Sequence, residues 1–112
     1  MRISDLLDII ENQGKGVRSY IECARICQER INEKPEDAAS YYLLKIAANR
    51  FVDAYDDQPL LSNLADSEFL NFKNYVDQLH AAEQEADPAM KLSTLNRVAH
   101  EIANHKLLRS AV

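Results

Sequence analysis

The chain has 112 residues and a formal net charge of −5, and its length fits one domain spanning residues 1–112. The negative charge argues against nucleic acid as a partner, because a phosphate backbone is bound through clusters of Lys and Arg. No apolar run approaches the roughly 20 residues that a membrane-spanning helix needs, and the first ten residues lack the features of a secretory signal. We therefore expect a cytoplasmic protein with no membrane segment.

The composition favours helices throughout the chain. Only two Gly and three Pro occur, and the good helix formers Ala, Leu, Glu, Lys, Arg and Gln dominate. We predict an all-α fold, a single-domain helical bundle of four long helices plus a short N-terminal helix. The short helix follows Ser4, a suitable N-cap, and ends at Gly14 and Gly16. Its apolar stripe consists of Leu6, Leu7, Ile9 and Ile10.

The second predicted helix runs from about Val17 to Lys34. Its apolar positions recur at helical spacing and are Val17, Tyr20, Ile21, Ala24, Cys27 and Ile31. Pro35 ends this helix, because the residue before a proline is pushed away from helical backbone angles. Pro35 also suits the first turn of the helix that follows.

The stretch from Ala38 to Tyr55 is apolar or aromatic on nearly every side, which is typical of a buried central helix. We expect this helix to be the hub against which the others pack their single apolar stripes. The segment Asp56–Pro59 stops it. A long connection from Gln58 to about Ala65 follows, and its leucines are expected to pack on the core; they are Leu60, Leu61 and Leu64.

The last two predicted helices run from about Ser67 to Ala86 and from Pro88 to about Leu108. Asp66 or Ser67 is expected to cap the first of them. Asp87 is expected to cap the second, with Pro88 in its first turn. The apolar stripes are Phe69, Phe72, Val76, Leu79 and Ala82 in the fourth helix, and Leu92, Leu95, Val98, Ala99, Ile102 and Leu107 in the fifth.

Charge is unevenly distributed along the chain. Residues 1–34 hold six acids and six bases, residues 35–87 eleven acids and three bases, and residues 88–112 one acid and four bases. In the simplest interpretation the basic last helix, with Lys106 and Arg109 near its end, packs beside the acidic middle. The alternative is an acidic surface that recognises a basic partner.

Three acids at the end of the hub helix occupy positions where negative charge is unfavourable. Asp53, Asp56 and Asp57 lie near a helix C-terminus, where negative charge opposes the helix dipole. Arg50 can offset Asp53 from one turn back. Three interpretations of Asp56 and Asp57 stay open: ion pairs with the last helix, a solvated turn, or a recognition patch that also contains Glu36, Asp37, Asp66 and Glu68.

Two adjacent tyrosines lie in the first half of the hub helix. Tyr41 and Tyr42 are about 100° apart around the helix axis, so one of them can be exposed while the other packs in the core. An exposed Tyr often anchors a protein interface. We therefore include both in a candidate interaction surface with Asp53, Asp56 and Asp57.

The segment Gly14–Ser19 is the most phosphate-like part of the sequence. Lys15, Gly16 and Arg18 are candidate anion ligands, because backbone amides at a helix N-terminus together with basic side chains can hold an anion. The segment is not a P-loop, which needs Gly-x4-Gly-Lys-Ser/Thr. A C-cap glycine followed by a flexible link explains it equally well.

The residues that most often bind metals give no metal motif. Cys23 and Cys27 share one helix face, but a closed zinc or copper site needs more soft ligands and no other Cys occurs. We interpret both as small buried side chains. The three histidines, His80, His100 and His105, form neither a Glu-x-x-His pair nor a His-Glu-x-x-His motif. We expect no metal and no cofactor.

No catalytic arrangement of residues is recognisable, so we expect that the protein is not an enzyme. The leading hypothesis is a protein–protein interaction module with an acidic face. An inhibitor or immunity-like partner of a basic protein is one version of it, and a homodimer is another. The alternative is a helical bundle that binds a small ligand or an anion, with the Gly14–Ser19 turn or the face of Cys23 and Cys27 lining the site.

Overall fold

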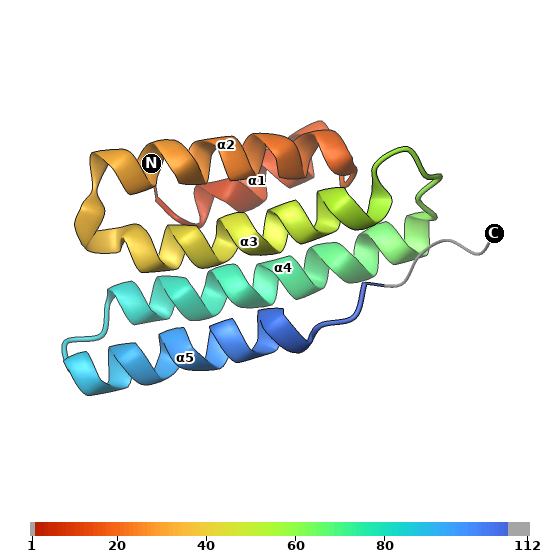
Figure 1. Ribbon diagram of the computed structural model, residues 1–112. Coiled ribbons are helices and arrows are strands. Elements are labelled where there is room, and N and C mark those ends of the chain that lie inside the picture. Colours follow the sequence, from red (N-terminus) through yellow and green to blue (C-terminus); the bar gives the residue numbers. More distant parts are fainter. Residues whose placement is uncertain (1, 108–112) are drawn as a thin grey trace.

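The computed structural model describes residues 2–107. Five α-helices lie side by side along one long axis (Figure 1), and no strand occurs in this range. The predicted fold class, an all-α helical bundle, is confirmed. The helices are α1 (Asp5–Gln13), α2 (Val17–Glu33), α3 (Ala38–Tyr55), α4 (Ser62–Glu83) and α5 (Pro88–Asn104).

The first two helices pack against each other and are joined by a tight turn. Helix α1 ends at Gly14, whose φ of 107° lies in the region that glycine adopts easily, and the Gly14 N–H donates to the carbonyl of Ile10 at 3.0 Å. Ser4 occupies the N-cap position without a capping hydrogen bond from its side chain. Pro35 begins a separate 3₁₀ turn, η1 (Pro35–Asp37), rather than the first turn of α3.

Helix α3 covers the stretch predicted for the hub, without the first turn expected from Pro35, and contacts α2, α4 and α5. Figure 1 shows it between the α1–α2 pair and the α4–α5 pair. One side of α3 is nonetheless exposed, at Tyr42, Asn49 and Asp53. The expectation of a helix buried all round is therefore wrong, because the helices packed on α3 leave one of its sides open to solvent.

Helix α4 begins earlier than predicted, so that Asp66 and Ser67 lie inside it and do not cap it. Asp66 instead forms an ion pair with Lys15 at 2.9 Å, a contact between α4 and the α1–α2 turn. The connection from α3 is correspondingly short. Leu60 is partly buried as expected, but Leu61 is 59% exposed.

Helix α5 begins as predicted and ends early. The Asp87 carboxylate accepts a hydrogen bond from the backbone N–H of Ala89 at 3.0 Å, which is the expected N-cap. The helix ends at Asn104, so Lys106 lies beyond it, and the predicted C-terminal base Arg109 is outside the described residues.

Two residues assigned to apolar stripes are exposed. Ile21 in α2 is 49% exposed and Leu92 in α5 is 57% exposed. In α2 the buried face is centred on Cys23 and Cys27, which turns Ile21 towards solvent. In α5 the buried residues lie in the second half of the helix, so the first turns extend past the core.

Aromatic rings from three helices meet in the centre of the core. The ring of Tyr20 in α2 stacks on Phe51 in α3 with 3.8 Å between the ring centroids, and Phe72 in α4 meets Tyr20 edge-on at 5.3 Å. Tyr55 lies 4.8 Å from Phe51. Such pairs add to the free energy gained from burying the rings, and they hold α2, α3 and α4 together next to the end of α5.

Candidate functional site

The three acids at the end of α3 are exposed. Asp53 lies in the last turn, Asp56 is the C-cap residue and Asp57 follows with a φ of 61°. Within residues 2–107 none of the three forms an ion pair. The interpretation that they pair with the bases of the last helix is therefore wrong for the described part of the chain, and the acids face solvent.

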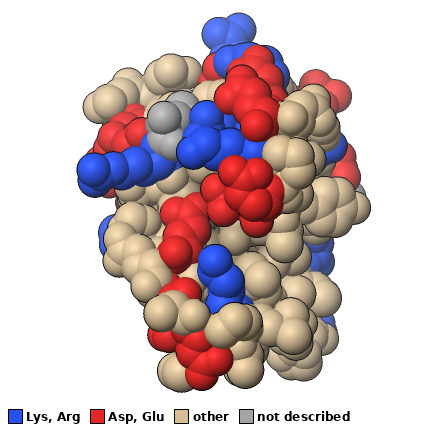
Figure 2. Space-filling view, turned by 90° about the vertical axis from the view of Figure 1, so that its left-hand side faces the viewer, with Lys and Arg blue, Asp and Glu red and all other residues tan. Residues whose placement is uncertain are grey.

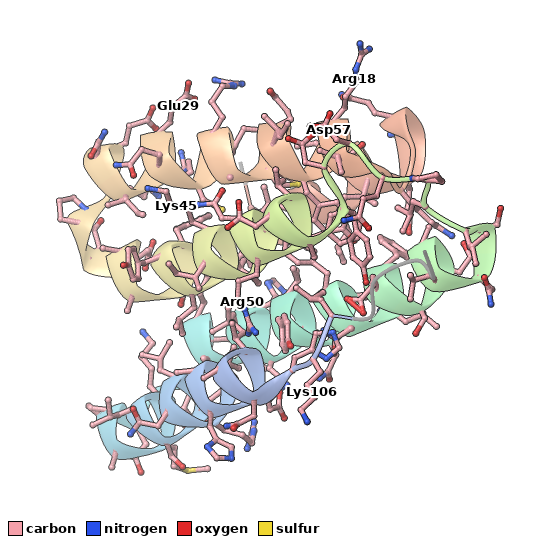
Figure 3. All side chains as sticks on the ribbon, turned by 45° about the vertical axis from the view of Figure 1, so that its right-hand side comes forward. Arg18, Glu29, Lys45, Arg50, Asp57 and Lys106 are labelled. Carbon is pink, nitrogen blue, oxygen red and sulfur yellow. The ribbon has the colours of Figure 1, made fainter. Side chains whose placement is uncertain are left out.

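Arg50 does not offset Asp53 as expected. Its guanidinium donates to the backbone carbonyl oxygens of Ile102 and His105, the second at 2.9 Å. Figure 3 shows Arg50 reaching from α3 towards the end of α5. The last carbonyls of a helix have no partner within the helix and lie at the negative end of its dipole. Arg50 therefore stabilises the C-terminus of α5 instead.

A shallow, open groove of about 320 Å³ lies beside Asp53. Arg50, Asp53 and Ala54 line it from α3, and Leu107 lines it from the segment that follows α5. The groove thus combines apolar surface with the carboxylate of Asp53 and the guanidinium of Arg50, which is itself bound to the carbonyls at the end of α5. This combination suits a long basic side chain, whose methylene stem covers apolar surface while its charged end reaches an acid.

One of the two adjacent tyrosines is exposed, as the sequence predicts. Tyr42 is 55% exposed, whereas Tyr41 is 2% exposed and lies with its ring centroid 5.9 Å from the guanidinium of Arg30. Tyr42, Asn49 and Asp53 follow one another at intervals of seven and four residues, so they share one face of α3. Tyr41 belongs to the core, and Tyr42 remains a surface candidate.

The wider acidic patch predicted from the sequence does not form. Glu36 and Asp37 lie before the start of α3, about 27 Å from the three acids at its other end, given 1.5 Å per helical residue. Figure 2 shows the end of the bundle that holds η1, where acidic and basic side chains are interspersed. Asp66 is paired with Lys15, and Glu68 is only 7% exposed. Of the predicted patch, Asp53, Asp56 and Asp57 remain.

The predicted anion ligands lie in different surroundings. The Lys15 ammonium pairs with Asp66 and lies 5.1 Å from the ring centroid of Phe69. Gly16 is the N-cap residue of α2. Arg18 is exposed and points away from the body of the molecule (Figure 3). Lys15 therefore takes part in an internal contact rather than in a shared site with Arg18.

Cys23 and Cys27 are free thiols and fully buried. Burial raises the pKa of each thiol to about 12, and the neighbouring Cys27 adds to the rise at Cys23. Since the thiolate is the form that attacks oxidants and binds metals, protonated thiols are inert near neutral pH. The interpretation of both as small buried side chains is confirmed.

The histidines do not gather at one place. His80 lies 3.3 Å from Gln84 within α4, and His100 lies 3.3 Å from Asn104 within α5. Among residues 2–107 no three side chains of His, Cys, Asp or Glu are close enough to hold a metal ion.

No helix in the described range combines the length and the apolar composition of a membrane-spanning segment.

A partly buried acid–imidazole pair is the feature that the sequence analysis missed. The Nε2 atom of His105 lies 2.9 Å from both carboxylate oxygens of Glu68. A carboxylate only accepts hydrogen bonds, so Nε2 carries the hydrogen. The assignment of Glu68 to a surface patch is wrong. A signal was present, because Glu68 precedes Phe72 by four residues and Tyr75 by seven, which places it on the buried face of α4.

A small cavity of about 20 Å³ lies beside this pair. That volume admits a single water molecule. Its polar lining comes from Tyr20, Arg50, Glu68, Asn71, Tyr75 and His105. The Tyr20 side chain is 1% exposed, and its hydroxyl has no hydrogen-bond partner among the described residues. Burial, with Cys23 and Glu68 nearby, raises the pKa of this hydroxyl well above its usual value.

Tyr20→Phe is expected to leave the free energy of unfolding unchanged or to raise it by up to about 1 kcal/mol, because it removes a desolvated hydroxyl that has no partner. Urea denaturation followed by circular dichroism measures the change. Tyr75→Phe is the matched control: its hydroxyl accepts a hydrogen bond from Asn71 at 2.9 Å, and its removal is expected to cost about 1 kcal/mol. A loss for Tyr20→Phe as large as that of the control would show that the Tyr20 hydroxyl is hydrogen-bonded through a water molecule.

Two parts of the molecule therefore stand as candidates: the exposed acids with their groove, and the buried pair with its cavity. They meet at the segment after α5, which supplies Leu107 to the groove and His105 to the cavity. No family model matches this chain, and no curated protein or solved structure is significantly similar to it.

Proposed function

We propose that the chain is a non-catalytic interaction module that binds a basic segment of another protein on the exposed face of α3. One observation carries this proposal. Asp53, Asp56 and Asp57 lie at a helix C-terminus, where they oppose the dipole, and no ion pair within residues 2–107 compensates them. A basic side chain from outside the chain would supply the missing counter-charge.

The groove beside Asp53 indicates which kind of side chain the partner would present. A Lys or Arg side chain would lay its stem along Leu107 and bring its charged end to Asp53. Tyr42 lies about 16 Å further along the same face of α3, at 1.5 Å per residue. An extended peptide covers that distance with about five residues, so Tyr42 is available as a second anchor. A cytoplasmic location is an associated part of this proposal.

The alternative functions have less support. A small-molecule site needs a cavity of several hundred Å³ that encloses its ligand, whereas the cavity beside Glu68 admits one water molecule. Anion binding at the α1–α2 turn competes with the Lys15–Asp66 ion pair. A second copy of the chain is the alternative partner for the face of α3, and sedimentation equilibrium at rising protein concentration detects it.

The test uses a short peptide rich in Arg and Leu as the probe and a Glu-for-Arg version of it as the control. Backbone amide shifts in ¹H–¹⁵N spectra of the full chain report where each peptide binds. We expect the basic peptide to shift residues around Asp53 and Leu107 and the acidic peptide to shift none. Binding should weaken as salt is raised, because exposed charges are screened.

A matched pair of variants separates a defined site from general attraction to an acidic protein. Asp53→Asn/Asp56→Asn/Asp57→Asn removes the proposed site. Asp8→Asn/Glu11→Gln/Glu36→Gln removes the same charge from exposed positions elsewhere. We expect only the first triple variant to abolish the shifts. Equal loss in both variants, or shifts spread over the whole surface, would overturn the proposal.

Asp56→Asn/Asp57→Asn is expected to leave the free energy of unfolding equal or slightly higher, because neither acid forms an ion pair within residues 2–107 and both oppose the dipole of α3. Asn also tolerates the positive φ at residue 57. Urea denaturation at low salt is the measurement. A clear loss of stability would place these acids in an internal ion pair and remove the main support for the recognition surface.

A further inference from the structure

The chain leaves α5 as a short extended segment that lies beside α4 and the end of α3. Helix α5 ends at Asn104, and His105 has φ and ψ of −71° and 126°. Residues His105–Leu107, which we call the strap, run from the end of α5 past the first turns of α4 (Figure 1). The strap covers the cavity with His105 and forms a wall of the acidic groove with Leu107.

Two side chains from other helices hold the strap by polar contacts. Glu68 of α4 binds the imidazole of His105 through both carboxylate oxygens, each at 2.9 Å. Arg50 of α3 binds the carbonyl of His105 at 2.9 Å and also the carbonyl of Ile102. Hydrogen bonds to charged groups are stronger than those between neutral groups, so these anchors dominate the attachment of the strap.

Within the strap, apolar contact with the core comes from one side chain, that of Leu107. Leu107 is partly buried and Lys106 is exposed; in Figure 3 the Lys106 side chain extends away from the bundle. The space beneath the strap is incompletely filled, because the cavity lies there and the hydroxyl of Tyr20 has no partner. A segment attached by few buried contacts is one that opens locally without global unfolding.

We propose that the strap is a latch: the Glu68–His105 pair and Arg50 keep it closed, and its opening removes the Leu107 wall from the acidic groove. Glu68 and His105 are positioning residues in this scheme, since neither lines the groove. With this latch, the presence of the Leu107 wall in the groove depends on the Glu68–His105 pair, which lies outside the groove. The consequence for partner binding rests on the proposed function, whereas the latch itself does not.

Cleavage by trypsin after Lys106 measures opening, because a protease cuts a segment in proportion to the population of its open form when opening is fast. We expect His105→Ala to speed cleavage at Lys106 about tenfold or more. Because this variant also unfolds globally more readily, cleavage at Lys73 within α4 is expected to rise as well, and the double variant described next separates the two effects. His100→Ala is the matched control, because His100 is exposed and its ring lies against Asn104 of its own helix. Mass spectrometry of the products identifies the site that is cut.

A double variant separates the latch from loss of stability. Glu68→Met/His105→Ala leaves no buried unpaired acid, so its resistance to urea should return towards that of the wild type. The strap nevertheless lacks its anchor, and cleavage at Lys106 should stay fast. Cleavage that slows in step with recovered stability, or that never exceeds the rate of His100→Ala, would overturn the latch.

The basic peptide then tests the link to the groove. If wild-type protein binds the peptide, affinity should fall in the double variant in proportion to the fraction of open strap. Unchanged affinity with fast cleavage would overturn the coupling and leave the interaction surface standing. Fast cleavage in the variant when the wild type binds no peptide would overturn the proposed function and leave the latch standing.

Discussion

Phe51→Ala is expected to lower the free energy of unfolding by about 3–5 kcal/mol, the usual cost of removing a large aromatic side chain from a core. Phe51 is 2% exposed, stacks on Tyr20 and lies against Tyr55. The variant loses the burial of the ring, the aromatic pairing and the packing between α2 and α3. Urea denaturation followed by far-UV circular dichroism, which reports helix content, measures the change.

The neighbouring residue provides the control for this prediction. Val52 is partly buried at the edge of the core, so Val52→Ala is expected to cost about 1 kcal/mol or less. The contrast between adjacent positions tests whether the side of α3 that faces α2 and α4 carries the core. Similar losses at the two positions would contradict the central role assigned to the aromatic rings.

His105→Ala is expected to lower the free energy of unfolding by about 2–4 kcal/mol, because it leaves the Glu68 carboxylate buried without its partner. The Glu68 side chain is 7% exposed and that of His105 is 29% exposed, so the acid bears most of the desolvation. Thermal and urea denaturation measure the loss. His100→Ala, an exposed change on α5, is expected to stay within about 0.5 kcal/mol of the wild type.

A double-mutant cycle shows whether the pair acts as a unit. Glu68→Met/His105→Ala replaces the acid with an apolar side chain of similar length, and its stability is expected to return to within about 1 kcal/mol of the wild type. Additive losses from the two single variants would contradict this result. They would mean that His105 and Glu68 contribute independently, and the buried pair would then not be what holds the strap.

Local patterns in the sequence were sufficient for most of the fold. Gly14, Pro35 and the Asp87-Pro88 pair act on the backbone at their own positions, so the corresponding helix ends were predicted closely. The end of α3 was predicted for the same reason, whereas the first turn expected from Pro35 forms η1 instead. The start of α4 was predicted wrongly, since Asp66 resembles a cap locally but pairs with Lys15, which is far away in the sequence.

The acids of the surface candidate could also be found from the sequence, because the conflict between Asp53, Asp56 and Asp57 and the helix dipole is local. The groove beside them could not, since Leu107 reaches it only after the chain has folded back. Tyr41 and Tyr42 show the same limit of prediction from local sequence. Helical geometry indicates that they point in different directions, but only the packing of α2 on α3 decides which is buried.

The sequence by itself therefore determined the number and kind of helices, the position of the hub and the acids at its end. The tertiary structure decided where α5 ends and what holds the strap. Glu68 and His105 are 37 residues apart, and Arg50 is 55 residues from the carbonyl it binds. No local periodicity links residues so distant. The contacts between these residues depend on how α3, α4 and α5 pack. The same contacts override the local tendency of α5 to continue beyond Asn104.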